Sequence, residues 1–293
     1  SIGHSLEGSV SMESLIKFKH SPDHITLYAD ASLRHATEDS FDRNRIDYYT
    51  NGLQSNTDFR NRYFNNRPDH GYSMTGKVTY SYLVKRGLFF DFSYKYNRTT
   101  SNRYSSLYRL DQLADWGINS EHELGILPSV DAYNRVMDIH NSYDSRQTDN
   151  THTLGAFLVW NKKTTKSEWW AQLVPNLSLL SRTMHYHSGN VDTTFTKRSI
   201  LYNMYSTFIK WRSTDHKYEF MLQYHVNGQA PDMNLFVNIL NTTDPLNVTM
   251  GNTNLKPSYK HELISHFLRI YPKKGLMWLI EAQYIPTVNA IAM

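Results

Sequence analysis

The chain has 293 residues, a net charge of +4 from 31 basic and 27 acidic residues, and no cysteine. The charges are spread along the sequence without a Lys/Arg run that would follow a phosphate backbone, so nucleic acid is not an expected partner. The lack of cysteine excludes disulfides, thiolate nucleophiles and Cys-based zinc sites. Aromatic residues reach 14%, led by 21 tyrosines, a composition that favours strands and interfaces.

The chain contains no stretch of about 18 uncharged apolar residues, the length that a membrane-spanning helix needs. A helical membrane protein is therefore excluded. A β-barrel is not, because only one face of each strand meets lipid while the other face and the loops stay polar. The first ten residues lack the charged start and apolar segment of an export signal, so we expect any such signal to be removed or to lie upstream.

Alternation of apolar and polar residues predicts ten strands, joined in pairs as hairpins. The first hairpin is expected within residues 6–33 and the second within residues 72–96. The alternation is weaker at Trp169 and Trp170 and again at Leu201 and Tyr202, where bulky residues fall on both faces. The five predicted hairpin turns are Ser21 to Asp23, Lys85 to Gly87, Lys162 to Ser167, Ser213 to His216 and Pro272 to Gly275.

The strand that follows the second turn has the clearest period. One face is apolar and the other is polar, so the apolar face is expected to meet lipid and the polar face a lumen. The apolar face carries Leu88, Phe90, Phe92, Tyr94 and Tyr96, and the polar face carries Asp91, Ser93 and Lys95.

Between the hairpins the sequence predicts long polar connections at 37–70, 105–140 and 227–258. Short turns on one side and long loops on the other are typical of outer-membrane barrels. The predicted fold is therefore an all-β, antiparallel, up-and-down transmembrane β-barrel with short periplasmic turns and long extracellular loops. A soluble antiparallel sandwich remains the alternative, because it too has one apolar face per strand.

The segment from Gly251 to Leu263 resembles a motif of TonB-dependent receptors, in which Gly251, Asn252, Asn254, Leu255, Lys256 and Pro257 are the matching residues. The stretches Ala230 to Leu235 and Asp244 to Leu246 are similar to the loop that precedes this motif in the Bacteroidetes group of outer-membrane barrels. The stretch Asp192 to Arg198 resembles a turn of the same group. The chain departs from the pattern at Ser258, where the family usually has Glu.

This resemblance implies that residues 1–293 form part of a 22-strand barrel in the outer membrane of a Gram-negative cell. The family's plug domain, its TonB box and its terminal aromatic residue have no counterpart in the chain, so a fragment of the barrel is expected. The implied function is import of a scarce nutrient, whether glycan, peptide, haem or siderophore. The implied partners are outer-membrane lipid, the TonB complex through the plug, the nutrient, and in some receptors a surface lipoprotein. An adhesin or assembly scaffold without transport is the alternative.

The expected ligand contacts lie in the connection at 105–140, where flat aromatic rings stand next to polar groups. They are Tyr104, Tyr108, Arg109, Asp111, Trp116 and Tyr133, with a short helix predicted from Asp111 to Trp116. Packing of the loop against itself is the competing explanation for these residues.

Two further groups carry weak chemical signals. His185 and His187 lie two apart, on one face of a strand, where they would need a third ligand to hold a metal. Asp111, Asp115, Glu121 and Glu123 would need to be paired in space to act as acid and base. We therefore expect no metal site, no cofactor and no enzymatic activity.

Overall fold

A computed structural model describes residues 1–237, 240–241 and 249–289. The chain is all-β, with 73% of residues in strands and 5% in helices, which confirms the predicted antiparallel all-β class. None of the described helices is long and apolar enough to cross a membrane. Asp244 to Leu246 and the last four residues, which enter the resemblance above, lie outside the described residues.

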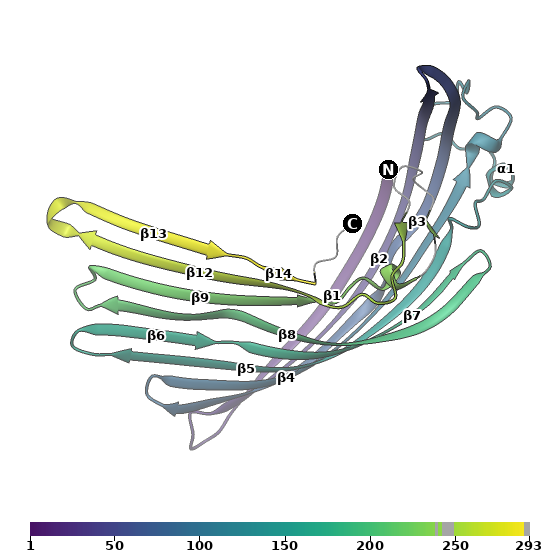
Figure 1. The fold of residues 1–293 in the computed structure, drawn as a ribbon. Helices are drawn as coiled ribbons and strands as arrows, with labels where there is room; N and C mark the ends of the chain where they lie inside the picture. The colour runs from purple at the N-terminus through teal and green to yellow at the C-terminus, as the bar shows by residue number, and fades with distance from the viewer. Residues whose placement is uncertain (238–239, 242–248, 290–293) are drawn as a thin grey trace.

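Within the described residues, twelve strands form one sheet (Figure 1). Neighbouring strands are antiparallel, as predicted, and the order is β1-β2-β3-β4-β5-β6-β8-β9-β12-β13. β7 continues the shorter β6 beyond Val174 and lies between β5 and β8, so the ten predicted strands are found when β6 and β7 are taken as one. The bounds are β1 Ile2–Lys17, β2 His24–Thr50, β3 Leu53–Lys85, β4 Leu88–Arg109, β5 Tyr143–Lys163, β6 Ser167–Leu173, β7 Pro175–Ser188, β8 Val191–Ser213, β9 Tyr218–Gln229, β12 Ser258–Tyr271, β13 Leu276–Tyr284 and β14 Thr287–Val288.

All five predicted turns lie at the same end of the strands, as Figure 1 shows. Each closes a hairpin whose terminal pairs face each other, from Lys17 opposite His24 to Tyr271 opposite Leu276. At the last turn Gly275 adopts a left-handed conformation (φ 60°), which glycine reaches without a steric penalty.

The predicted long connection at 37–70 is wrong. β2 and β3 continue through it as a hairpin, pairing from Glu38 opposite Asn66 to Thr50 opposite Leu53. Its tip is Asn51 and Gly52, both with positive φ, the Asn-Gly pair that favours a tight hairpin turn. Polar composition hid these strands, because apolar residues such as Phe41 and Tyr63 are too few there to set a two-residue period.

The other long connections are present. Residues 110–142 contain the 3-10 helix η1 (Leu110–Gln112) and the helix α1 (Val130–Asn134), so the helix predicted from Asp111 to Trp116 is wrong in position. Residues 230–257 contain the 3-10 helix η2 (Met233–Phe236) and the two-stranded sheet of β10 (Leu240–Asn241) and β11 (Thr249–Met250). A further 3-10 helix, η3 (Pro272–Lys274), forms the last turn.

The register keeps apolar residues in phase from strand to strand. Ile25 is opposite Tyr80, Tyr80 is opposite Phe92, and Phe92 is opposite Ala156. Side chains directly opposite each other point to the same face, so these rows build one continuous surface, here called the apolar face. It also carries Val10, Met12, Leu27, Val78, Phe90, Tyr94, Leu154, Leu158, Leu177, Ile200, Ile209, Phe220, Leu222, Leu263, Phe267 and Ile280.

The opposite surface, here called the polar face, holds the charged residues that alternate with the apolar rows. Lys77 is opposite Lys95, and Arg212 is opposite Glu219. Lys210 and Arg212 each form an ion pair of 2.6 Å with Glu219. The segregation of charge and apolar bulk onto opposite faces follows from the two-residue period of a strand.

The apolar face is not covered by a second sheet. In the part of the chain that the structure describes, the remaining strands are only the short β10 and β11. Many of its large side chains are therefore exposed, including Leu154, Leu177, Ile200 and Ile280. A sandwich core would place a packed sheet about 10 Å away.

One irregularity changes the phase within a strand. Between Met204 and Thr207, β8 has one more residue than β9 opposite it, and Ser206 there has a positive φ of 46°. This β-bulge lies beside Val174, where β6 passes into β7. The apolar face is formed by even residues of β8 before the bulge, such as Ile200, and by odd residues after it, such as Ile209.

The tip of the β2–β3 hairpin gives a direct test of the strands at 37–70. In Gly52→Ala the methyl group opposes the positive φ at a cost of about 1 kcal/mol, so amides of residues 41–62 should exchange about fivefold faster than in the wild type. The control is Gly76→Ala, because Gly76 has no positive φ and an added Cβ there meets nothing within 4 Å. Unprotected amides over 41–62 in the wild type would contradict the hairpin.

Candidate functional site

The predicted aromatic residues gather in a small core at the end of the sheet opposite the hairpin turns. Phe41, Tyr63 and Tyr108 lie in one row of β2, β3 and β4, and their rings stack at 5.1 and 5.3 Å between centroids. Tyr133 from α1 meets the Tyr108 ring edge-on at 4.9 Å. Trp116 completes the buried cluster. The connection at 110–142 is thus packed on the same side of the sheet as the apolar face.

Polar contacts fix the start of this connection. The Asp111 carboxylate accepts from the Asn61 backbone N–H at 3.4 Å and from Arg109 at 3.2 Å. The Asn61 amide donates to the Trp116 carbonyl at 3.2 Å. Burial, together with the hydrogen bond to Asp39, raises the pKa of Tyr63 to about 12. These contacts hold the predicted pair Arg109 and Asp111 in a structural role.

Of the six predicted ligand-contact residues, the structure brings Tyr108, Trp116 and Tyr133 together with the Arg109–Asp111 pair beside them. Tyr108 and Trp116 are buried, so their ring faces are occupied by other rings. Tyr104 lies apart from this core and is exposed, with the Arg67 guanidinium 6.0 Å from its ring centroid. Among the six, Tyr104 presents the most accessible ring for a ligand.

The residues of the family-like motif dock the connection at 230–257 onto the polar face. The Asn252 N–H donates to the Leu235 carbonyl at 2.7 Å, and the Asn254 N–H donates to the Asn252 side chain at 2.9 Å. Leu255 packs against a buried cluster of Met184 from β7 with Met233, Phe236 and Val237. Pro257 directly precedes β12, and its carbonyl accepts from Asn289 at 3.2 Å.

Gly251 lets two backbone segments approach each other. A Cβ at this position would lie 1.9 Å from the Val237 carbonyl oxygen, so only glycine fits. Lys197 of β8 strengthens the dock, donating to the Thr253 carbonyl at 3.1 Å and lying 4.7 Å from the centre of the Phe236 ring. Lys256, also in the motif, follows Leu255 at the exit of the connection.

A cluster of charges lies under this docked connection on the polar face. Arg182 of β7 is opposite Asp149 of β5, is only 5% exposed, and donates to the Pro231 carbonyl at 2.6 Å. Its Nε and Nη2 atoms are buried without a hydrogen-bond partner among the described residues. Arg103 of β4 lies 3.8 Å from Asp232.

Burial shifts the titration of this cluster. It raises the pKa of Asp149, against hydrogen bonds from Gln147 at 2.8 and 3.0 Å, and lowers the pKa of Arg182. Tyr143 and Tyr186 stack beside it at 5.8 Å, and burial raises the pKa of both. Buried guanidinium donors with stacked tyrosines are suited to holding a polar ligand or an ordered water.

Sequence reasoning did not find this cluster. Arg103, Asp149, Arg182 and Asp232 come from four separate elements, and only the strand register brings them together. The sequence carries only a weak signal for the cluster, because Arg103, Asp149 and Arg182 occupy ordinary positions on the polar face of their strands.

His185 and His187 lie on one face of β7, as predicted. Their Nδ1 atoms are 3.6 and 3.7 Å from the Asp192 carboxylate, and His185 also contacts the Thr194 hydroxyl at 2.9 Å. No group of three or more metal-ligating side chains that could hold an ion is found among the described residues.

Comparison with models of protein families and with curated proteins gives no match to this chain. A function for this chain is therefore inferred from the geometry of the sheet and its connections.

The dock of the 230–257 connection is testable at Gly251. Gly251→Ala forces the Val237 and Gly251 backbones apart, at a cost of about 1–3 kcal/mol, so limited proteolysis should cut within 230–257 at least about fivefold faster. The control is Gly117→Ala, since a Cβ at Gly117 meets nothing within 4 Å. Equal cleavage rates for the two variants would contradict the dock.

The charge cluster predicts a pH dependence. Because the pKa of Asp149 is raised, the folded chain retains a proton there above the ordinary carboxyl value near 4. The unfolding free energy should therefore fall as the pH rises from about 4 to the raised pKa, and Asp149→Asn should remove this fall. The measurement is the urea midpoint in lipid vesicles at a series of pH values.

Asp215 provides a control, because its contribution to the unfolding free energy depends on pH with the opposite sign. Lys217 and Ser213 lower its pKa to about 2, so its stabilising contribution is complete above about pH 4 and is lost as the pH falls toward 2. Asp215→Asn should remove only this low-pH loss. A midpoint profile of Asp149→Asn identical to that of the wild type would refute the assignment to Asp149.

Proposed function

We propose that this chain forms part of the wall and surface loops of an outer-membrane β-barrel, and that the intact protein is a TonB-dependent receptor that imports a scarce nutrient. The observation that carries the proposal is the apolar face, which runs across the sheet and which no second sheet covers in the described part of the chain. A soluble protein rarely exposes a contiguous apolar surface larger than a few hundred square ångströms. Lipid is the solvent that suits this surface.

The dimensions of the apolar face support a membrane span. Along β4 it runs from Leu88 to Tyr96, and along β5 from Trp160 to His152. A strand crosses the hydrocarbon core in about 9–11 residues, so the apolar rows of β4 and β5 are long enough to span it. The polar face would then line the lumen.

Aromatic residues border the apolar face at both ends, as in outer-membrane barrels. Near the turns, Trp169 and Trp211 meet edge-on at 6.5 Å, and Arg269 lies 4.3 Å from the centre of the Tyr271 ring. At the far border, the Tyr94 hydroxyl bonds His152 at 2.7 Å and the Tyr96 hydroxyl donates to Asn150 at 2.9 Å. Such side chains place a ring in lipid and a polar tip at the interface.

The open edges of the sheet favour a barrel with more strands. β1 pairs only with β2, and β13 pairs only with β12, in the described residues. In lipid, each unpaired backbone group costs several kcal/mol, so both edges need further strands. This need agrees with the larger, 22-strand barrel implied by the resemblance.

Import is supported by the connection at 230–257. The residues that resemble the receptor motif hold this connection against the polar face, which faces the lumen in the proposed orientation. A polar connection packed there, above the buried Arg182 and Asp149, is suited to contact with a nutrient entering the barrel. The TonB complex and the plug are the further parts that import requires.

The orientation of the sheet is tested at β4. Phe92→Arg should destabilise the inserted intact protein by about 2–4 kcal/mol, because the charge would lie near the middle of the lipid layer, whereas Ser93→Arg should have little effect because it faces the lumen. The measurement is the urea unfolding free energy in vesicles. Equal effects of the two substitutions would contradict the proposed faces.

Import is tested by deleting the gene and growing the cells on single nutrient sources. Growth should fail on one source only, and deletion of TonB should reproduce the defect. Unimpaired growth on every source, together with loss of surface adhesion, would favour an adhesin or scaffold instead.

A further inference from the structure

On β4 and β5 the apolar face ends in a sharp change of chemistry. The last apolar row there contains Tyr96 and His152, which is opposite Leu179 of β7. The next row toward the long connections holds Arg98, opposite Asn150, and the row after it holds Thr100, opposite Thr148. These two strands therefore change from apolar to cationic and hydroxyl-bearing within a few residues, whereas β1 and β3 keep Val10 and Met74 in the row of Arg98.

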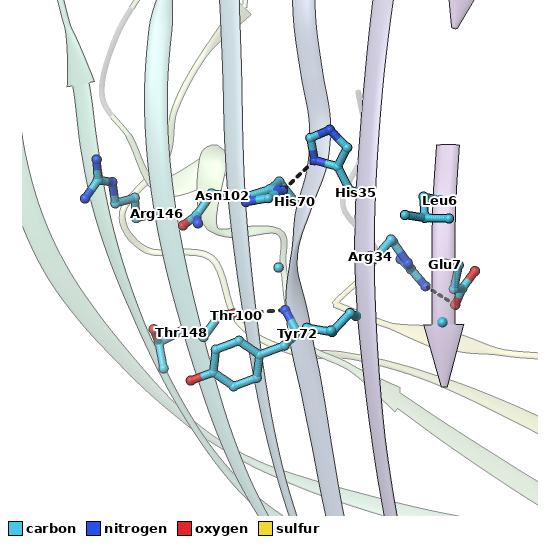
Figure 2. Close-up of a pocket in the computed structure, with 13 residues that line it drawn as sticks. Leu6, Glu7, Arg34, His35, His70, Tyr72, Thr100, Asn102, Arg146 and Thr148 are labelled. Carbon is cyan, nitrogen blue, oxygen red and sulfur yellow. Dashed lines mark hydrogen bonds and ion pairs between the residues drawn. The ribbon is translucent and has the colours of Figure 1, made fainter. Parts of the chain in front are cut away.

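Beyond these rows the same side of the sheet contains a hollow of about 770 Å³ (Figure 2). It lies where β2 and β3 lose register between His35 and Glu38, a bulge that includes Pro68. Proline has no N–H to donate to the ladder, so the pairing is interrupted there. His35 and His70 point toward each other across this opening, with their Nδ1 atoms 2.7 Å apart.

The lining of the hollow is amphipathic. On β1 and β2, Leu6 and Leu33 are 73% and 69% exposed. On β4 and β5, Asn102 and Arg146 continue the row that runs from Leu6 through His35 and His70, as Figure 2 shows. An apolar wall beside hydrogen-bond donors matches a molecule with a polar head and a hydrocarbon tail.

The charges around the hollow are mainly positive. Arg67, Arg98 and Arg146 are exposed on this side of β3, β4 and β5, and Arg98 has no ion-pair partner among the described residues. The nearby acids are Asp144, 3.8 Å from Arg146, and Glu7, which lines the hollow and pairs with Arg34 at 3.6 Å. One step further out, Asp192 faces His185 and His187.

We propose that this hollow binds the phosphate headgroup of a lipid in the outer leaflet of the membrane, with Arg146, which lines it, as the main contact and Arg98, two residues before Thr100 on β4, beside its margin. The inference rests on the proposed membrane span, which places the hollow where headgroups lie. The arginine fork matches phosphate oxygens, the Thr100 and Thr148 hydroxyls supply further donors, and Leu6 and Leu33 contact the start of the acyl chains.

The test measures lipid bound to the intact detergent-solubilised protein by native mass spectrometry. The probes are phosphatidic acid and diacylglycerol with the same acyl chains, which differ only in the phosphate. Phosphatidic acid should bind at least tenfold more tightly. Each neutralised arginine should weaken its binding about fivefold, so Arg98→Gln with Arg146→Gln should remove most of the preference.

The matched control is Lys77→Gln with Lys95→Gln, which removes the same charge from the polar face and should leave binding unchanged. Folding is checked by the heat-dependent mobility of the barrel in gels, and Arg146→Gln alone serves if the double variant does not fold. Equal binding of the two lipids, or equal loss in the control, would overturn the lipid site while leaving the barrel intact. Failure of the wild type to insert into bilayers would overturn the proposed function itself.

Discussion

The phase of side chains across the strand ladder is the constraint on which this structure depends. Ile25, Tyr80, Phe92 and Ala156 stand in one row because the registers of β2 with β3, β3 with β4 and β4 with β5 are all in phase. A shift of one residue in any of these pairings would send a strand's apolar side chains to the polar face. The register of the ladder therefore determines the chemistry of both surfaces.

The two long connections at the other end of the strands pack on different surfaces of the sheet. The connection at 110–142 builds its own aromatic core beside β2, β3 and β4, where Tyr63 and Tyr108 are buried. The connection at 230–257 instead lies on the polar face, held by Arg182 and Lys197. One connection therefore extends the wall, and the other covers the side that faces the lumen in the proposed barrel.

Most of the fold could be predicted from the sequence, because apolar and polar residues alternate strongly along the strands wherever one face of the sheet is apolar. The strand from Leu88 to Tyr96 and all five hairpin turns were predictable for this reason. The strands through 37–70 were not, because apolar residues such as Phe41 and Tyr63 are too few there to set an alternation. Strand register was also inaccessible, so the contact between Arg182 and the Pro231 carbonyl could not be predicted from residues so far apart in the chain.

The site was predictable only in part, for a related reason. Aromatic residues such as Tyr108 and Trp116 mark a place where rings collect, but sequence does not tell whether ring faces meet each other or a ligand. The charged residues under the 230–257 connection carried no local pattern at all. Their chemistry arises from burial, which only the docked connection provides.

The bulge at Ser206 has a consequence for how this wall tolerates change over evolution. The weak alternation at Leu201 and Tyr202 precedes it, and the apolar positions of β8 change from even to odd across it. The extra residue works like a frameshift that separates two reading frames within one strand. Deleting it would join the frames and leave the apolar side chains of both halves on the same face, whereas deleting a residue elsewhere in β8 would turn one half of the strand inside out. The loss of a single residue should therefore be tolerated better at the bulge than at other positions of β8.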